Sequence, residues 1–197
     1  MKNSHLALAA FAAIALGLLV GYLFQDKSRE VKGYPGFGGE FSLTSAEGPV
    51  ALSDLTGKVV VLYFGFTNCP DVCPISLGKA SAALKEMNPE QRSQVKVVLI
   101  TLDPERDTAN ILADYTAFFG EEFIGLTGTA EQIADVTNRY KVVYQKVDTP
   151  ESSLEYTVDH SSNTFVISKD GVVRFIVSNG SETGEYRDRI LDAINGV

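Results

Sequence analysis

Uninterrupted apolar runs in the middle of the chain predict a buried sheet. Residues 59–66 read Val-Val-Val-Leu-Tyr-Phe-Gly-Phe, and residues 95–102 read Val-Lys-Val-Val-Leu-Ile-Thr-Leu. Runs of β-branched and aromatic residues without polar alternation are typical of strands buried on both faces, in a sheet that helices cover. We therefore predict an α/β fold in which these two segments are neighbouring central strands.

Helical spacing follows the first run and recurs later in the chain. Leu77, Ala80 and Leu84 recur at the spacing of one helix face, and Asn88-Pro89 closes that segment. Thr129-Ala-Glu-Gln132 matches a capping box, which predicts a helix from there to about residue 140. Further helices are predicted over residues 108–119 and 182–194, and short strands over residues 123–126 and 142–147.

Two predicted hairpins complete the fold. The first joins residues 40–43 to residues 50–52, and a short turn then leads into the central strand. The second joins residues 156–168 to residues 172–177 through Asp170-Gly171, after a polar loop over residues 148–155. Together, these elements predict a mixed sheet flanked by helices. Strand–helix–strand units come first in the chain, and a hairpin and a helix come last.

The N-terminal segment has a different pattern, because residues 6–24 contain no charged side chain. As a helix, these residues span roughly 28 Å, close to the bilayer hydrocarbon thickness of about 30 Å. A cleaved signal peptide has a shorter apolar region and a small-residue cleavage site, so it fits less well. We predict a membrane anchor over residues 1–26, a linker over residues 27–36 and a folded domain over residues 37–197.

Charges beside this segment do not settle its orientation. Lys2 precedes it, whereas Lys27, Arg29 and Lys32 follow it. Taken alone, the positive-inside rule leans slightly against an exported domain.

Both cysteines of the chain lie between the first buried strand and its helix. Cys69 and Cys73 are only four residues apart, so a disulfide between them would close too small a loop to stabilise the fold much. The strand-to-helix turn is where open α/β sheets place their chemistry. A reactive or metal-binding pair is therefore predicted.

Proline spacing predicts how the helix after the cysteines begins. Pro74 suits the first helical position, which makes Cys73 the expected N-cap. A thiol at a helix N-terminus has its pKa lowered below the free value of about 8.5, because the helix dipole favours the thiolate. We expect both sulfurs to be solvent-exposed.

Composition excludes some functions. The chain has 197 residues, 45% of them hydrophobic, and a formal net charge of −8 at pH 7, without a cluster of Lys and Arg. Binding of nucleic acid needs a concentrated basic face, so a nucleic-acid partner is not expected.

Four ordered motifs carry a resemblance to a known family. They are Tyr63-Phe-Gly-Phe-Thr-Asn-Cys-Pro-Asp-Val-Cys-Pro74, Leu102-Asp-Pro-Glu-Arg-Asp107, Leu126-Thr-Gly-Thr129 and Tyr156-Thr-Val-Asp-His-Ser161. Cysteines between a strand and a helix, followed by a late hairpin and a terminal helix, resemble a thioredoxin fold. Together with these motifs, the chain from residue 37 onward resembles the Sco/SenC family. Those proteins are membrane-tethered copper proteins that assist the assembly of cytochrome c oxidase.

The resemblance implies a ligand set for Cu(I) or Cu(II). Cys69 and Cys73 would supply two sulfurs, and the family's third ligand, a histidine, maps onto His160. Copper(I) prefers thiolates, and copper(II) accepts mixed thiolate and imidazole ligands. His5 lies beside the membrane segment, so His160 is the only imidazole of the folded domain. Without this context, a lone loop histidine would be interpreted as a surface or hydrogen-bonding residue.

Four aspartates and one asparagine near these residues have open roles. Asp103 either adds a weak oxygen ligand, or adjusts the sulfur pKa, or caps the next helix together with Asp107. Asp71 should face solvent near the metal, and Asp159 is a candidate partner for the His160 ring through adjacency alone. Asn68 departs from the family, in which many members have histidine or an aromatic residue at this position.

The resemblance also implies partners and a location. The expected acceptor is the cytochrome c oxidase subunit with the CuA site, and other copper chaperones or thiol reductants would act on the same sulfurs. The expected location is a bacterial-type inner membrane, spanned once, with the domain on the periplasmic side. Copper would leave by ligand exchange with the acceptor.

Two alternatives use the same residues. The first is a thiol-disulfide oxidoreductase in which Cys69 and Cys73 are the redox-active pair, although such pairs usually have two intervening residues rather than three. His160 has no obvious role in that chemistry. The second is a membrane-tethered redox or copper sensor, and copper transfer to an apo acceptor would distinguish it from a chaperone.

Overall fold

The computed structural model describes residues 33–34, 36–151 and 154–197. All of them belong to one compact unit, residues 31–197. The predicted anchor and most of the predicted linker lie outside the described residues. Within the described ranges, no helix combines the length and the apolar character needed to cross a bilayer.

The centre of the unit is a five-stranded mixed sheet in the order β5-β4-β3-β8-β9. Strand β3 (Val59–Gly65) is its middle strand, and all seven of its residues are buried. It pairs in parallel with β4 (Val95–Thr101) and antiparallel with β8 (Thr164–Ile167). The outer strands are β5 (Phe123–Leu126), parallel to β4, and β9 (Val173–Val177), antiparallel to β8. The predicted central strands are confirmed as neighbours.

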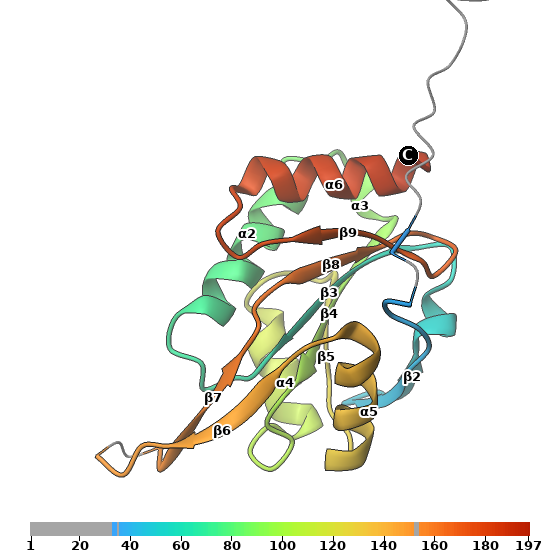
Figure 1. Ribbon diagram of the computed structural model, residues 1–197. Helices are drawn as coiled ribbons and strands as arrows, with labels where there is room; N and C mark the ends of the chain where they lie inside the picture. Colours follow the sequence, from blue (N-terminus) through green and yellow to red (C-terminus); the bar gives the residue numbers. More distant parts are fainter. Residues whose placement is uncertain (1–32, 35, 152–153) are drawn as a thin grey trace, which may run out of the picture. The chain divides into compact units, whose positions relative to one another are not determined.

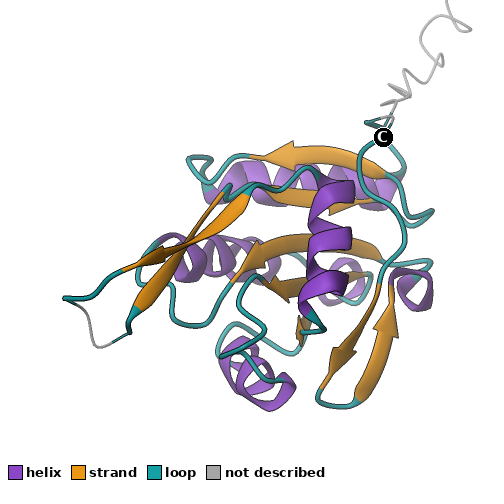
Figure 2. Ribbon diagram, turned by 60° about the horizontal axis from the view of Figure 1, so that its bottom comes forward, coloured by secondary structure: helices purple, strands orange, loops and turns teal. Residues whose placement is uncertain are grey.

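Helices cover both faces of this sheet (Figures 1 and 2). Successive strand residues point to opposite faces. Tyr63 lies against Cys73 of α2 (Val72–Lys85), whereas the Phe64 ring lies 5.5 Å from the Tyr140 ring of α5 (Ala130–Tyr140). Helix α6 (Thr183–Asn195) packs beside α2, and α4 (Ala109–Ala117) packs on β5.

Shorter elements surround the sheet. The predicted N-terminal hairpin is present as β1 (Ser42–Ser45) and β2 (Gly48–Ala51). A 3-10 helix η1 (Leu52–Leu55) and a one-turn helix α3 (Pro89–Arg92) precede β3 and β4. The predicted capping box of α5 is confirmed, because Thr129 accepts the Gln132 N–H at 3.3 Å and Gln132 accepts the Thr129 N–H at 2.8 Å.

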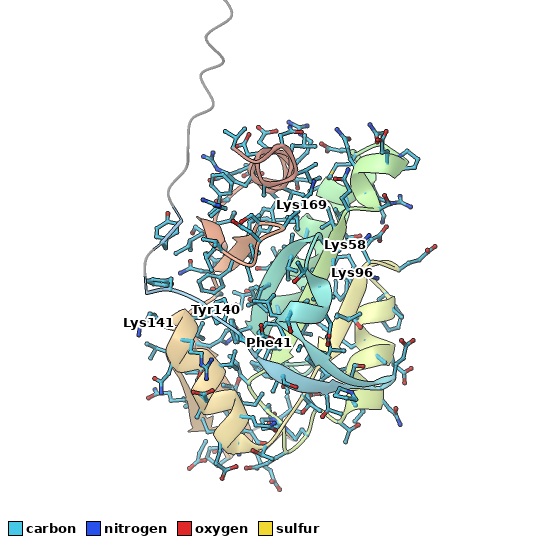
Figure 3. The ribbon with its side chains drawn as sticks, turned by 90° about the vertical axis from the view of Figure 1, so that its right-hand side faces the viewer. Phe41, Lys58, Lys96, Tyr140, Lys141 and Lys169 are labelled. Atoms are coloured by element: carbon cyan, nitrogen blue, oxygen red, sulfur yellow. The ribbon has the colours of Figure 1, made fainter. Side chains whose placement is uncertain are left out.

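Lysines gather at the N-terminal end of β3 and β4, as Figure 3 shows for Lys58, Lys96 and Lys169. Their amines bind neighbouring oxygens: Lys58 donates to the Ser93 carbonyl at 2.6 Å and Lys169 to Gln94 at 2.8 Å. The cysteines follow β3, so they lie at the opposite end of the sheet.

The second predicted hairpin is partly wrong. Residues 156–168 do not form one strand; they form β7 (Tyr156–His160) and β8, separated by Ser-Ser-Asn. Strand β7 pairs with β6 (Tyr144–Asp148) in a separate two-stranded ribbon, and only β8 pairs with β9. The ribbon projects from the body of the domain (Figure 1). Strand β8 is apolar and fully buried, whereas β7 contains polar and half-exposed residues, so only β8 suits the interior of the sheet.

Candidate metal centre

The helix after the cysteine loop begins earlier than predicted. Its N-cap is Asp71 and its first residue is Val72, so the expectation that Cys73 is the N-cap is wrong. Pro74 is consequently the third helical residue. Its missing N–H costs nothing there either, because the first four N–H groups of a helix have no intrahelical partner. Cys73 remains in the first helical turn.

Both sulfurs are less accessible than expected. Cys69 is 8% exposed, Cys73 is 0% exposed, and both are free thiols. The expectation of solvent-exposed sulfurs is therefore wrong, because Cys73 packs against Tyr63 and Gly65 of β3. The Cys73 N–H donates to Cys69 Sγ at 3.4 Å, which joins the two cysteines.

Two residues of β3, Tyr63 and Gly65, pack against Cys73. The Tyr63 hydroxyl donates to Cys73 Sγ at 3.9 Å, and burial raises the pKa of Tyr63, so the phenol keeps its proton. Gly65 leaves the room that the sulfur occupies. A Cβ atom added to Gly65 would lie 2.7 Å from Cys73 Sγ and 2.9 Å from Tyr63 Cε1. Only glycine allows α2 to approach the strand this closely.

The two thiols have opposite electrostatic environments. The hydrogen bond from Cys73, followed by those from the Asp71 and Cys73 N–H groups, lowers the pKa of Cys69 to about 5. The hydrogen bond with Cys69 and burial raise the pKa of Cys73. Cys69 therefore has the lower pKa of the two and is the thiol that favours the thiolate. A lowered thiol pKa was expected for Cys73 at the helix N-terminus. The thiol with the lowered pKa is Cys69 instead.

His160 reaches the cysteines from the end of β7. Its Nε2 lies 3.7 Å from Cys73 Sγ, although the two residues are 87 positions apart in the sequence. Its Nδ1 lies 3.1 Å from the Val158 carbonyl, which can only accept a hydrogen bond, so Nδ1 donates to it and Nε2 is the ring nitrogen that faces the sulfur. Asp159 is exposed, so its predicted role as the ring's partner is wrong. A backbone carbonyl of the same strand takes that role.

Asp103 is fully buried and is engaged away from the sulfurs. Its Oδ1 accepts a hydrogen bond from the Tyr156 hydroxyl at 2.8 Å, and its Oδ2 forms an ion pair with Arg106. Both oxygens are occupied, so a further ligand role has no support in this arrangement. The alternative that Asp103 and Asp107 cap the next helix is wrong, because Thr108 is the N-cap of α4.

Asp107 has a structural role that was not predicted from its sequence context. This fully buried carboxylate accepts the Thr67 N–H at 3.0 Å and the Thr101 hydroxyl at 2.7 Å, and also binds the Thr67 hydroxyl. It thereby holds the start of the cysteine loop against the end of β4. The nearest signal was its place in the Leu102–Asp107 motif, but its main partner, Thr67, lies 40 residues away.

Asp71 and Asn68 both lie on the exposed side of the loop, as expected for Asp71. In the described ranges, no three His, Cys, Asp or Glu side chains are already grouped tightly enough to hold a metal ion. The structure thus brings Cys69, Cys73 and His160 together as neighbours, but it does not form a closed set of ligands.

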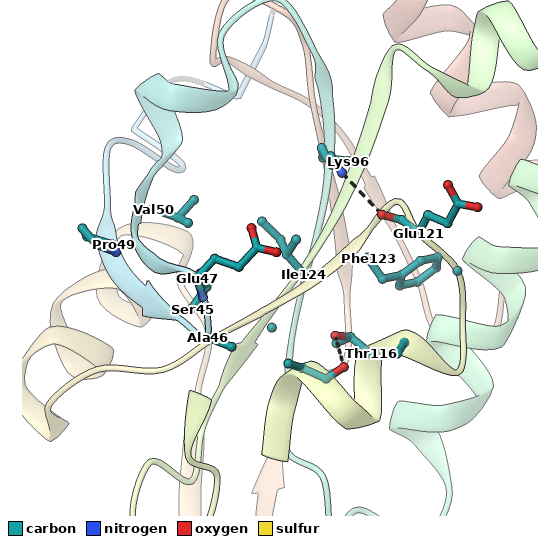
Figure 4. Close-up of a pocket in the computed structure, with 14 residues that line it drawn as sticks. Ser45, Ala46, Glu47, Pro49, Val50, Lys96, Thr116, Glu121, Phe123 and Ile124 are labelled. Carbon is teal, nitrogen blue, oxygen red and sulfur yellow. Dashed lines mark hydrogen bonds between the residues drawn. The ribbon is translucent and has the colours of Figure 1, made fainter. Parts of the chain in front are cut away.

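A cavity of about 590 Å³ lies elsewhere, between the β1–β2 turn, α4 and β5 (Figure 4). Its lining includes Glu47, Lys96 and Phe123, and neither cysteine. It has no part in the candidate metal centre.

Comparisons with known proteins agree with this arrangement. The SCO1/SenC family model matches residues 29–195. An SCO2-like protein of Rickettsia conorii is 42% identical over 135 residues, which are 68% of this chain and 65% of that protein. The chain therefore matches slightly less than two thirds of that relative's length.

Solved structures match about four fifths of the chain. ScoI of Arabidopsis thaliana with copper bound is 35% identical, with a TM-score of 0.75 over 82% of this chain and 99% of that one. ScoI of Bradyrhizobium japonicum with copper bound is 33% identical, with a TM-score of 0.71 over 80% and 99%. The thioredoxin-like α/β fold with a central mixed sheet is confirmed, and the chain belongs to the SCO1/SenC family.

Proposed function

We propose that this protein binds copper through Cys69, Cys73 and His160 and delivers it to the CuA site of cytochrome c oxidase during assembly. The observation that carries the proposal is the 3.7 Å approach of His160 Nε2 to Cys73 Sγ from a distant strand. Two sulfurs and one imidazole nitrogen suit copper in both oxidation states. Two similar solved structures have copper bound, which supports copper as the ion.

The three ligands would have different roles in binding. Cys69 is already a thiolate near neutral pH, so it would meet the ion first. Cys73 must lose its proton before both sulfurs can bind, and His160 directs Nε2 toward Cys73 while its Nδ1 binds the Val158 carbonyl. The side chains must converge further on the ion, since the described residues contain no ready group of three ligands.

Delivery would proceed by ligand exchange from the Cys69 side. Cys73 is enclosed by β3 and α2, whereas Cys69 keeps some exposure and is flanked by exposed Asn68, Pro70 and Asp71. An acceptor thiolate or imidazole would therefore displace Cys69 first and Cys73 last. A site that opens on one side in this way can bind the ion tightly and still release it to a partner.

Copper binding by the full chain in detergent tests the proposal. Cys69→Ser and Cys73→Ser should each abolish tight copper(I) binding, because one thiolate cannot replace two. His160→Ala should weaken copper(II) binding by at least about tenfold more than copper(I) binding, because imidazole matters more to copper(II). Competition with copper(I) and copper(II) chelators measures both affinities.

Mixing the copper-loaded chain with an apo CuA domain tests delivery. The acceptor should gain the CuA absorption bands, and Lys141→Ala, which changes an exposed residue outside this centre, should transfer copper as the wild type does. Full copper(I) affinity in a serine variant, or equal losses of both copper states in His160→Ala, would refute the ligand set. Binding without transfer would favour a sensor over a chaperone.

A second candidate, a thiol-disulfide reductase, is favoured by the unequal thiols. Cys69, with a pKa of about 5, suits the attacking thiolate, and buried Cys73 suits the resolving thiol. Cys69 would attack a partner disulfide and release one partner thiolate, which takes up a proton. Cys73 would then lose its proton and attack Cys69 Sγ, forming the Cys69–Cys73 disulfide and leaving the partner reduced by two electrons. His160→Ala should spare this activity while it weakens copper(II) binding.

The proposed location is a bacterial-type inner membrane, crossed once by residues 6–24, with the domain on the periplasmic side. The charge-free stretch of that segment supports the anchor. The family's membrane tether supports the orientation, which the flanking charges do not.

A further inference from the structure

His160 belongs to a ribbon that has no strand pairing with the central sheet in the described part of the chain. Strands β6 and β7 form their own two-stranded sheet, and their ladder bonds join them only to each other in the described ranges. A two-stranded ribbon by itself is only marginally stable in water. Contacts other than sheet pairing must therefore hold His160 beside the sulfurs.

Three side chains provide such contacts at the start of β7. Arg106 Nη1 donates to the carbonyls of Leu154 and Tyr156, both at 3.1 Å, and its guanidinium lies 3.7 Å from the centre of the Tyr156 ring. Arg106 Nε also pairs with Asp103, which in turn accepts the Tyr156 hydroxyl at 2.8 Å. Asp103, Arg106 and Tyr156 thus form a closed set of contacts, which we call the brace.

The brace is anchored in the interior of the domain. Asp103 is fully buried, and a buried carboxylate stays charged at low cost only while its partners remain in place. The same turn includes Asp107, whose N–H donates to the Asp103 carbonyl at 2.9 Å and whose carboxylate holds Thr67 of the cysteine loop. One five-residue turn therefore connects the cysteine loop to the strand that ends in His160.

We propose that the brace is a positioning device that sets the approach of His160 to Cys73 and thereby the preference of the site between copper(II) and copper(I). Tyr156 and His160 are the first and last residues of β7, so a shift at one end moves the other along the same strand. The preference for copper(II) rests on the proposed copper site, whereas the position of the ring does not require copper.

Tyr156→Phe and Arg106→Lys test the brace in the full chain in detergent. The first keeps the ring under the guanidinium and removes only the hydroxyl that binds Asp103. The second keeps the charge and loses the planar fork that reaches Asp103 and two carbonyls together. Each should weaken copper(II) binding roughly tenfold and alter the copper(II) absorption and electron paramagnetic resonance spectra, with copper(I) affinity unchanged within about twofold.

Two controls distinguish an effect on the position of His160 from a general loss of structure. Lys146 also lies over the Tyr156 ring, at 4.6 Å, but its ion pair with Glu105 is on the surface, so Lys146→Ala should leave copper(II) binding within about twofold of wild type. In a His160→Ala background, the brace substitutions should have no further effect on copper(II) affinity. An equal loss of copper(I) affinity, or a persistent effect in that background, would overturn the inference.

A copper-free measurement distinguishes this inference from the copper proposal. In the apo protein, nuclear Overhauser contacts should join the His160 ring to the rings of Tyr63 and Phe66, whose centroids lie 6.4 and 5.8 Å away. Tyr156→Phe should weaken these contacts and shift the His160 signal, which His160→Ala identifies. Unchanged contacts in both brace variants would refute the brace even if copper binds. Changed contacts in a protein that binds no copper would refute only the copper proposal.

Discussion

At the residue scale, identical side chains acquire different properties from their positions. Cys69 accepts hydrogen bonds from Cys73 and from two backbone N–H groups, whereas Cys73 is enclosed between β3 and α2. The first environment favours a thiolate, and the second disfavours it. The pair therefore titrates as a unit, with one proton shared unequally over a wide pH range.

The proton on Cys73 predicts how copper(I) binding depends on pH. Protons compete with copper for sulfur, so affinity should fall as pH falls. Above the Cys69 pKa of about 5, binding to both sulfurs displaces one proton. The logarithm of the association constant should then rise by about one per pH unit at neutral pH, and by about two per unit in more acidic solution.

Competition with a copper(I) chelator across this pH range measures both slopes. Cys69→Ser serves as the control, because it should remove the change of slope together with the tight site. A flat profile would contradict binding through thiolates. A slope of about two at neutral pH would contradict the low Cys69 pKa.

At the scale of elements, the site depends on how closely α2 packs against β3. Gly65 lies in the strand at the point where Cys73 Sγ fills the space that a side chain would need. Overpacking of a tight core forces side chains from their rotamers and shifts the backbone, at a cost of about 1–3 kcal/mol. The close contact therefore contributes to both the stability of the domain and the position of the sulfur.

Gly65→Ala should lower the free energy of unfolding by about 1–3 kcal/mol and weaken copper(I) binding, because Cys73 must move. Gly78→Ala is a matched control within α2, where an added Cβ would have no neighbour within 4 Å. It should raise stability by about 0.5–1 kcal/mol, since alanine is the better helix former. Chemical denaturation measures the free energy of unfolding of both variants. Equal changes in this free energy would contradict the close packing at Gly65.

At the scale of the whole molecule, the predicted anchor would confine the folded domain to a membrane surface. An anchored chaperone meets a membrane-bound oxidase by diffusion in two dimensions, which suits the proposed acceptor. The linker of about ten residues would hold the domain near the bilayer.

Fractionation tests the anchor. The full chain should remain with membranes after alkaline carbonate extraction, because residues 6–24 are long enough to span. Ala15→Arg combined with Leu16→Arg should release it, since each arginine at the centre of a span costs about 2.5–3.5 kcal/mol. Ser28→Arg, outside the apolar stretch, is the matched control and should stay bound. Release of the wild-type chain by carbonate would contradict the anchor.

Much of the fold followed from local pattern, and the errors about strand pairing and buried contacts share one cause. The strands at Val59–Gly65 and Phe123–Leu126 and the cap at Thr129 depend on neighbours in sequence, so they were predictable. The pairing of β7 with β6 and the bond from Asp107 to Thr67 depend on segments far apart in the chain. Nothing in the local pattern distinguishes these partners from others.

The sequence alone was enough to predict the central strands at Val59–Gly65 and Val95–Thr101, the place of both cysteines where the first of these strands leads into its helix, and the residues that resemble the family motifs. The spacing of apolar residues, the helix caps and the prolines act on neighbours within a few residues. Their effects can therefore be predicted from the sequence. Tertiary packing was needed to show that Cys73 is buried, that hydrogen bonds lower the pKa of Cys69 and not that of Cys73, and that the Val158 carbonyl orients His160. Those properties depend on burial and hydrogen bonds between elements, which exist only after the chain has packed.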